Sequence, residues 1–474
     1  MAASVRPEVS KGRADPSIPH GKVRGGLSNL PPLTAPPFDT SGRTGFVRRA
    51  LSGRLGLVRR ALAAASVALF TSGAWADTDA GGELRLRWDA RSANPAGPLA
   101  DANRLAPGIA SATPNAAVAE AELNARWKLL SAKLLLASER HEGGSARSTA
   151  RFNELVASGD FGAWQASVGK KVVGWDVGHG FRPNDFVQQA ERRTLLALPQ
   201  EGRPLLQLEH FKAESATSLV WVNPQRIGRS SDAQRRADES AFALRWYTRA
   251  GAADWHLFGR AGQHTGASAG AAFAWVASDA LALHASARLM QRHDGWRIDP
   301  AAGVGAVSAN PWRLQTRGGA AQWLLGASWT GEAQQSVIAE WWYDGTALAD
   351  GEWDRWQARG DALSAVSVLP GLPAGTRQGL AGNLAWQATP FAAPNLRRDN
   401  LFVRLAWQPD HWLFTLDALI TPADGGHVVT AGLQWQGDRV RLNAAWRTQG
   451  GPADALFAQL PQRRSGAVSA AWAF

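Results

Sequence analysis

From residue 82 onward the chain alternates apolar and polar residues with a period of two. Leu84, Leu86 and Trp88 alternate with charged neighbours in residues 83–89, and residues 119–128 repeat the pattern. This period indicates β-strands with one apolar and one polar face. The segments run about ten residues, whereas most strands of globular proteins have about five or six. Strands of about nine to eleven residues have the length that crosses a membrane at a tilt.

Eighteen such segments can be counted along the chain. They lie near residues 83–89, 119–128, 131–140, 151–158, 161–170, 204–211, 216–223, 240–249, 254–261, 270–277, 280–290, 318–329, 334–343, 399–408, 411–420, 427–436, 439–448 and 464–474. An even number places both ends of a barrel on the same side. Sixteen strands is the alternative, if the weakly patterned pair in 151–170 does not cross. Residues 380–390 also alternate weakly and are assigned to a long loop, 344–398.

Tryptophan distinguishes a membrane barrel from a water-soluble β-sandwich. The chain has 23 tryptophans, and many lie at or near segment ends on the apolar face: Trp88, Trp127, Trp246, Trp255, Trp329, Trp407, Trp412, Trp435, Trp446 and Trp472. Aromatic residues gather there where a barrel wall meets the two membrane interfaces. Short and long connections also alternate. The sequence therefore predicts an all-β fold, a closed antiparallel transmembrane β-barrel with short periplasmic turns and long external loops.

The region before the barrel has the features of a secretion signal. Arg59 and Arg60 precede an apolar stretch, and an A-x-A cleavage pattern ends at Ala76. We expect a signal peptide over residues 46–76 and a mature barrel over 77–474. Residues 1–45 lack periodicity and are expected to be disordered or untranslated. Residues 1–76 carry eleven Lys and Arg against three acids, which accounts for +8 of the net charge of +11, so the charge does not favour a nucleic-acid partner.

Catalytic and cofactor sites find little support in the sequence. The absence of cysteine excludes thiolate metal sites and cysteine nucleophiles. His293 and Asp294 are neighbours in a long loop, as are His141 and Glu142, and adjacent residues of an extended chain point apart. We therefore expect no catalytic residue, no metal and no cofactor, and no enzyme activity.

The alternation of a β-strand continues to the last residue of the chain. Val468, Ala470, Trp472 and Phe474 share its apolar face up to the last residue. Chain ends usually fray unless something ties them down, so we expect the last strand to pair with the first and close the barrel. Signal, strands and terminal Phe together resemble Gram-negative outer-membrane β-barrels. That resemblance implies that Trp472 and Phe474 form the insertion signal, and that the partners are outer-membrane lipid, lipopolysaccharide and the barrel-assembly machinery.

Inward positions of the expected strands are rich in arginine. The candidates for lumen lining are Arg85, Arg87, Arg126, Arg245, Arg249, Arg288, Arg404, Arg441 and Arg447. A charge facing lipid near the midplane costs a few kcal/mol, so these side chains must line water or pair inside the barrel. Two interpretations remain open. The arginines either form a lattice neutralised by acids such as Glu120 and Asp417, or a channel that favours anions.

The most unusual stretch runs from 169 to 193 and opens a loop, 171–203, long enough to fold into the pore. It is similar to the strand-to-loop segment of porin-like families, including alginate-export-like and uncharacterised barrels. The matching positions are Gly169, Lys170, Trp175, Pro183 and Asp185. The candidates for a pore constriction are Arg182, Asp185, Glu191, Arg192 and Arg193. A surface loop pinned by its own salt bridges is the equal alternative.

These features favour a porin or channel for passive or facilitated passage of hydrophilic solutes, anionic ones included, across the outer membrane. Two alternatives share the architecture. One is a channel that exports an exopolysaccharide along arginine-lined walls. The other is a closed structural or adhesion barrel that acts through its external loops.

Overall fold

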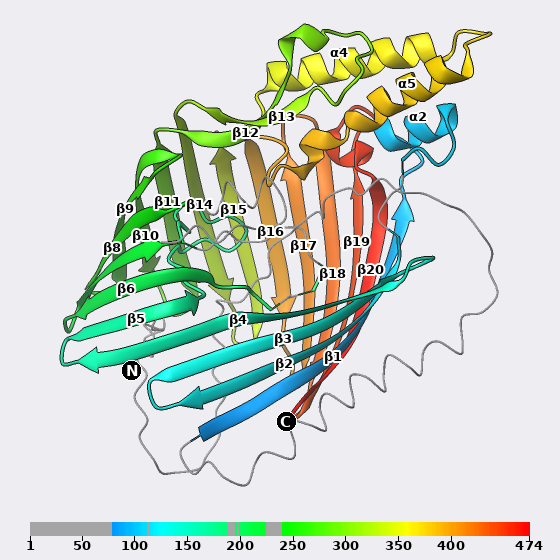
Figure 1. The fold of residues 1–474 in the computed structure, drawn as a ribbon. Coiled ribbons are helices and arrows are strands. Elements are labelled where there is room, and N and C mark those ends of the chain that lie inside the picture. The colour runs from blue at the N-terminus through cyan, green and yellow to red at the C-terminus, as the bar shows by residue number, and fades with distance from the viewer. Residues whose placement is uncertain (1–77, 111–113, 188–194, 197–198, 224–238) are drawn as a thin grey trace.

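Figure 1 shows the computed structural model of the protein. The structure describes residues 78–474 except 111–113, 188–194, 197–198 and 224–238. The expected signal peptide, its cleavage position near Ala76 and the upstream segment 1–45 lie outside the described residues.

Eighteen antiparallel strands form one closed sheet in which each strand pairs with its neighbours in sequence. The fold class and the strand number predicted from the alternation are therefore confirmed. The weakly patterned pair in 151–170 does cross, as β4 and β5. The strands are β1 (Thr78–Ala93), β2 (Ala116–Trp127), β3 (Leu130–His141), β4 (Ala146–Phe161), β5 (Trp164–Lys171), β6 (Arg203–Phe211), β7 (Ser215–Val222), β8 (Ala241–Ala250), β9 (Ala253–Gly262), β10 (Gly266–Val276), β11 (Leu281–Met290), β14 (Ala320–Thr330), β15 (Gln335–Asp344), β16 (Asp399–Trp407), β17 (Trp412–Thr421), β18 (Gly426–Gln436), β19 (Val440–Gly450) and β20 (Gln462–Ala473).

The barrel closes where β1 pairs with β20, in a register that runs from Glu83 opposite Ala473 to Ala93 opposite Gln462. The last residue belongs to this ladder. Phe474 N–H donates to Gly82 O, and Gly82 N–H donates to Phe474 O, both at 3.0 Å. A Cβ on Gly82 would lie 2.6 Å from the ring of Phe474 and from Glu122 O. Gly82 therefore leaves the space that the terminal aromatic ring occupies.

The two faces of the wall differ as the alternation predicts. On the outer face Leu86 and Trp88 are 50% and 45% exposed, and Leu416 is 44% exposed. The neighbouring side chains of Arg85 and Arg87 point inward and are 14% and 12% exposed. An apolar outside around a charged inside is the reverse of a water-soluble barrel, and it suits a wall surrounded by lipid.

The two ends of the barrel are built differently (Figure 1). The C-terminus and the short turns lie at one end, which we call the turn end. Among the described residues, the opposite end, the loop end, carries three helices and a two-stranded hairpin: α2 (Pro98–Leu105), α4 (Asp350–Ser367), α5 (Ala374–Trp386), β12 (His293–Ile298) and β13 (Trp312–Arg317). Short 3-10 turns accompany them, namely η1 (Pro300–Ala302), η2 (Thr389–Ala392) and η3 (Leu456–Gln459). In the described part of the chain, no helix is both long enough and apolar enough to cross a membrane.

The helices of the loop end form a cap with its own apolar core. Trp353 and Trp356 of α4 are 2% and 3% exposed and pack with Phe391, Leu456 and other buried residues. Both indoles donate to backbone carbonyls, of Leu396 and Gln387, at 2.8 Å. The core extends to the wall, because it includes a residue of β18 and packs on β17. Residues 380–390 were correctly excluded from the strands, but the alternation did not predict the helix there.

Candidate functional site: the barrel lumen

Residues 172–187, here called the inserted segment, lie against the inner wall. The backbone N–H groups of His179 and Gly180 each donate to the carboxylate of Glu340 on β15, at 2.6 Å. Glu340 is 1% exposed and also accepts from His284 of β11 at 2.8 Å. Asn184 Nδ2 donates to Ser286 Oγ at 2.9 Å. Buried charge-assisted bonds of this kind are stronger than neutral ones.

Apolar packing adds to this polar anchoring. Val173, Trp175, Phe186 and Val187 are buried in a cluster whose other buried members come from the inner faces of β6 to β10: Leu205, Val220, Val222, Ala243, Phe258 and Ala272. Phe181 packs with Leu324 and Trp342 of β14 and β15. The inserted segment therefore fills the lumen on the side of β6 to β15.

Two wall glycines make this close approach possible. A Cβ on Gly270 of β10 would lie 1.9 Å from Asn184 Oδ1. A Cβ on Gly326 of β14 would lie 2.2 Å from His284 Nε2, the group that bonds Glu340. Any side chain at these positions would push the inserted segment, or the histidine that supports it, away from the wall.

Two buried carboxylates shape the inserted segment from within. Asp185 Oδ1 accepts from the N–H groups of Trp175 and Asp176, at 2.8 and 3.2 Å. Asp176 Oδ2 accepts from Asn184 N–H at 2.5 Å and from Ser286 Oγ at 2.9 Å. Burial, together with the charge of Asp185, raises the pKa of Asp176 to about 6. Asp185 is thus a turn-shaping residue, with its side chain only 6% exposed.

The open part of the lumen is a cavity of about 750 Å³ on the side of β16 to β20, β1 and β2. It runs from Gly82 at the turn end to Leu396 and Phe457 beneath the cap. The described residues that line it include six arginines and three carboxylates: Arg85, Arg87, Arg182, Arg404, Arg441, Arg447, Glu83, Glu122 and Asp417.

Ion pairs hold several of these arginines against the wall. Arg404 makes two bonds to Asp417, at 2.6 and 2.7 Å. Arg441 pairs with Glu83 at 2.7 Å, and Glu83 also meets Arg85. Arg447 is held by a neutral group, because its Nε donates to Thr430 Oγ1 at 2.8 Å. Three further lining arginines meet carboxylates that do not themselves line the cavity. Arg85 lies 3.1 Å from Glu120, Arg87 3.2 Å from Asp89 and Arg182 3.7 Å from Asp185. The lattice interpretation therefore describes most of the wall, while the described residues that face the cavity itself include more arginines than carboxylates.

The other predicted lining residues lie apart from this cavity. Arg288 donates to Pro183 O at 3.1 Å and lies 4.4 Å from the ring of Phe186, so it fastens the inserted segment. Arg245 contacts His256 on the neighbouring strand. Arg249 donates to a turn carbonyl, that of Gly251, and Arg126 is exposed at the turn end.

Of the constriction candidates, Arg182 lines the cavity, and its Nε donates to Gly178 O at 2.8 Å. Glu191, Arg192 and Arg193 lie outside the described residues. Sequence reasoning did not select Glu340 or His179. The only signal for Glu340 is an acid at an inward position of a strand, next to Trp341 and Trp342.

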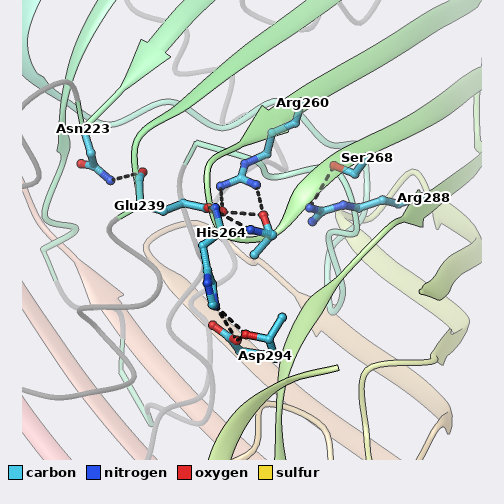
Figure 2. A network of polar contacts seen from close by, with 9 residues as sticks. Asn223, Glu239, Arg260, His264, Ser268, Arg288 and Asp294 are labelled. Carbon is cyan, nitrogen blue, oxygen red and sulfur yellow. Dashed lines mark hydrogen bonds and ion pairs between the residues drawn. The ribbon is translucent and has the colours of Figure 1, made fainter. Parts of the chain in front are cut away.

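A second polar network ties the loop-end rim together (Figure 2). Glu239 pairs with Arg260 at 2.6 Å and accepts from the N–H groups of His264 and Thr265. Burial opposes the charge of Glu239, but Arg260 and the bonds from Thr265 outweigh it and lower the pKa of that carboxyl. His264 Nε2 lies 2.9 Å from Asp294 Oδ1, a contact that joins the β9–β10 turn to the β12–β13 hairpin.

That histidine is not arranged as a catalytic relay. Thr316 Oγ1 lies 2.9 Å from the same Nε2 that meets Asp294. A nucleophile and an orienting carboxylate use the two different ring nitrogens of a catalytic histidine. The contact is therefore a structural link across the rim.

No family model matches the chain, and no curated protein sequence matches it. Solved structures do resemble its fold. OccK8 of Pseudomonas aeruginosa is 9% identical with a TM-score of 0.51, and the match covers 84% of this chain and 98% of that one. OccAB1 of Acinetobacter baumannii is 10% identical with a TM-score of 0.48, over 85% and 98% of the two chains. A mutant porin of Rhodopseudomonas blastica is 10% identical with a TM-score of 0.40, over 84% and 100%. At these identities the likeness concerns the fold alone.

Proposed function

We propose that the protein is an outer-membrane channel of a Gram-negative bacterium for passive or facilitated passage of hydrophilic solutes, with a preference for anions. The single observation that carries the proposal is the excess of positive charge on the surface of the open lumen, where the described lining residues include six arginines and three carboxylates. The apolar outer face with tryptophans near the strand ends supports the membrane location. The fold shared with OccK8 agrees with this architecture.

In this proposal a solute passes beside the inserted segment rather than through the centre of the barrel. The packed side from β6 to β15 leaves the arginine-rich wall as the route, with Arg182 facing that route from the inserted segment. Lipid and lipopolysaccharide surround the wall. Trp472 and Phe474 would be read by the barrel-assembly machinery during insertion.

Planar-bilayer recording of the purified protein tests the proposal. We expect steady conductance and a reversal potential in a KCl gradient that favours chloride over potassium by about two- to fivefold, the effect of roughly 0.5–1 kcal/mol of electrostatic bias. A closed structural barrel would give no conductance. A preference for potassium would contradict the role of the arginines.

The Arg404–Asp417 pair allows the charge of the route to be changed by one unit. We expect Asp417→Asn to raise the chloride preference, because it leaves Arg404 without the carboxylate that neutralises it. The measurement is the same reversal potential. Glu154→Gln is the matched control, because Glu154 pairs with Lys133 on β3 and does not line the cavity. Equal shifts in the two variants would show that Arg404 does not face the permeating ions.

A further inference from the structure

The arginine-rich wall contains a neutral, hollow region that charge selectivity alone does not explain. Ala445 of β19 and Gly432 of β18 stand opposite each other in the sheet, and both line the cavity. Thr415 of β17 comes next on the same rung, and its Oγ1 lies where a side chain on Gly432 would stand. Small side chains at three neighbouring inward positions leave a depression in the wall.

Neutral hydrogen-bonding groups border this depression on the side of the turn end. The next inward-facing rung lies two residues further along each strand, about 6.8 Å from the rung of Gly432 and Ala445. On it the strand register places Gln434, Asn443 and Ser469 side by side. All three line the cavity, and Asn443 Nδ2 donates to Ser469 Oγ at 3.1 Å. We call the depression and its border the niche: Thr415, Gly432, Gln434, Asn443, Ala445, Ser469 and Arg87.

Arg87 supplies the positive charge of the niche. It stands opposite Ser469 in the register of β1 and β20, and it lines the cavity. Its Nε lies 3.2 Å from Asp89, which holds the side chain against the wall. A guanidinium that lines a cavity forms strong, charge-assisted hydrogen bonds with the oxygens of an anionic ligand.

We propose that the niche binds a small organic anion that carries several hydroxyl groups, with its carboxylate at Arg87 and its hydroxyls on Ser469, Asn443 and Gln434. Amide and hydroxyl side chains donate and accept at once, so they suit hydroxyl groups, which do the same. The site sits in the open part of the lumen, so a bound solute exchanges with the route rather than blocking it permanently. This inference rests on the proposed function and specifies the solute class.

Two six-carbon monocarboxylates, gluconate and hexanoate, test the niche because they share charge and chain length and differ in hydroxyl groups. Reversal potentials with KCl on one side and either potassium salt on the other give their relative permeabilities. We expect gluconate to permeate about fivefold better than hexanoate, the effect of about one net hydrogen bond. Equal permeation, or a preference for hexanoate, would overturn the proposal. The apolar lining of Leu413, Leu419 and Phe402 would then decide the solute class.

Variants assign the preference to the niche. The double change Asn443→Leu with Gln434→Leu is expected to bring the gluconate-to-hexanoate ratio close to one. Asn124→Leu, an amide that lines the same cavity from β2, is the matched control and should keep the ratio. Arg87→Gln should lower the permeation of both anions by a similar factor. A ratio that persists in the double variant would place the preference elsewhere.

The outcomes separate the two proposals. Absent conductance, or a cation preference, contradicts the channel itself. A chloride-preferring channel with no gluconate preference leaves the channel standing and removes only the niche. Heat-dependent migration of each variant on a detergent gel confirms that its barrel has folded.

Discussion

Leu416→Arg is expected to destabilise the barrel in a lipid bilayer by about 2–4 kcal/mol. Leu416 is near the middle of β17 on the outer face and is 44% exposed. Because that face meets hydrocarbon, the guanidinium of an arginine there would lose its hydration. The carboxylates of the wall point into the lumen and could not form an ion pair with it. Urea unfolding of the protein in lipid vesicles, followed by tryptophan fluorescence, measures the change.

Thr415→Arg is the matched control for this substitution. Thr415 is the preceding residue, so its side chain points into the lumen, where it lines the water-filled cavity. We expect its free energy of unfolding to change by about 0.5 kcal/mol or less. Similar destabilisation by both arginines would contradict the assignment of an outer lipid face and an inner wet face.

The strands could be predicted from the sequence because their signal is local. A period of two repeated over about ten residues places Leu84, Leu86 and Trp88 outside without knowledge of the partner strands. Closure could be predicted for a similar reason. The last strand carries the same pattern up to Phe474, and its backbone groups must be paired if they lie in lipid.

The contents of the lumen could not be predicted in the same way. The position of the inserted segment depends on Glu340, Gly270 and Gly326, which lie roughly 85 to 170 residues away in the chain. These residues come close to the segment only when the strands have paired in their final register and the barrel has closed. The inward arginines were identified correctly as inward, but alternation does not say which of them face open water. Arg404 lines the cavity, whereas Arg288 is used to fasten Pro183 and Phe186.

The cap escaped prediction for a different reason. Its helices α4 and α5 lie in the segment treated as one loop, and the apolar pattern of 380–390 is compatible with more than one structure. Trp353 and Trp356 became buried because the cap packs on itself and on β18, a contact distant in sequence. Tryptophans therefore occur in two different environments, on the outer face near the ends of the strands and in the apolar core of the cap.

A barrel of eighteen strands would enclose a wide pore if it were empty. Two insertions reduce it. The inserted segment packs one side of the lumen with apolar residues, and the cap covers the wall of β17 and β18 at the loop end. Selectivity then depends on one wall rather than on a ring, so single substitutions on β16 to β20 should have larger effects on permeation than substitutions facing β6 to β10.

Gly270→Ala is expected to raise the single-channel conductance and its fluctuations, because the inserted segment can no longer pack against β10. The added Cβ would lie 1.9 Å from Asn184 Oδ1 and 2.7 Å from Ala287 O. Asn184 would lose its bonds to Ser286 Oγ and Ala287 O, which weakens docking by about 1–3 kcal/mol. A displaced segment opens the packed side of the lumen to ions.

Two further variants show whether displacement of the segment is the cause. Gly259→Ala on the neighbouring strand β9 is the control, because a Cβ there meets no atom within 4 Å, and its conductance should equal that of the natural protein. Asn184→Ala removes the same bonds from the side of the segment and leaves the wall unchanged, so it should also raise the conductance. If only Gly270→Ala had an effect, distortion of the wall would be responsible, and the inserted segment would not limit the current.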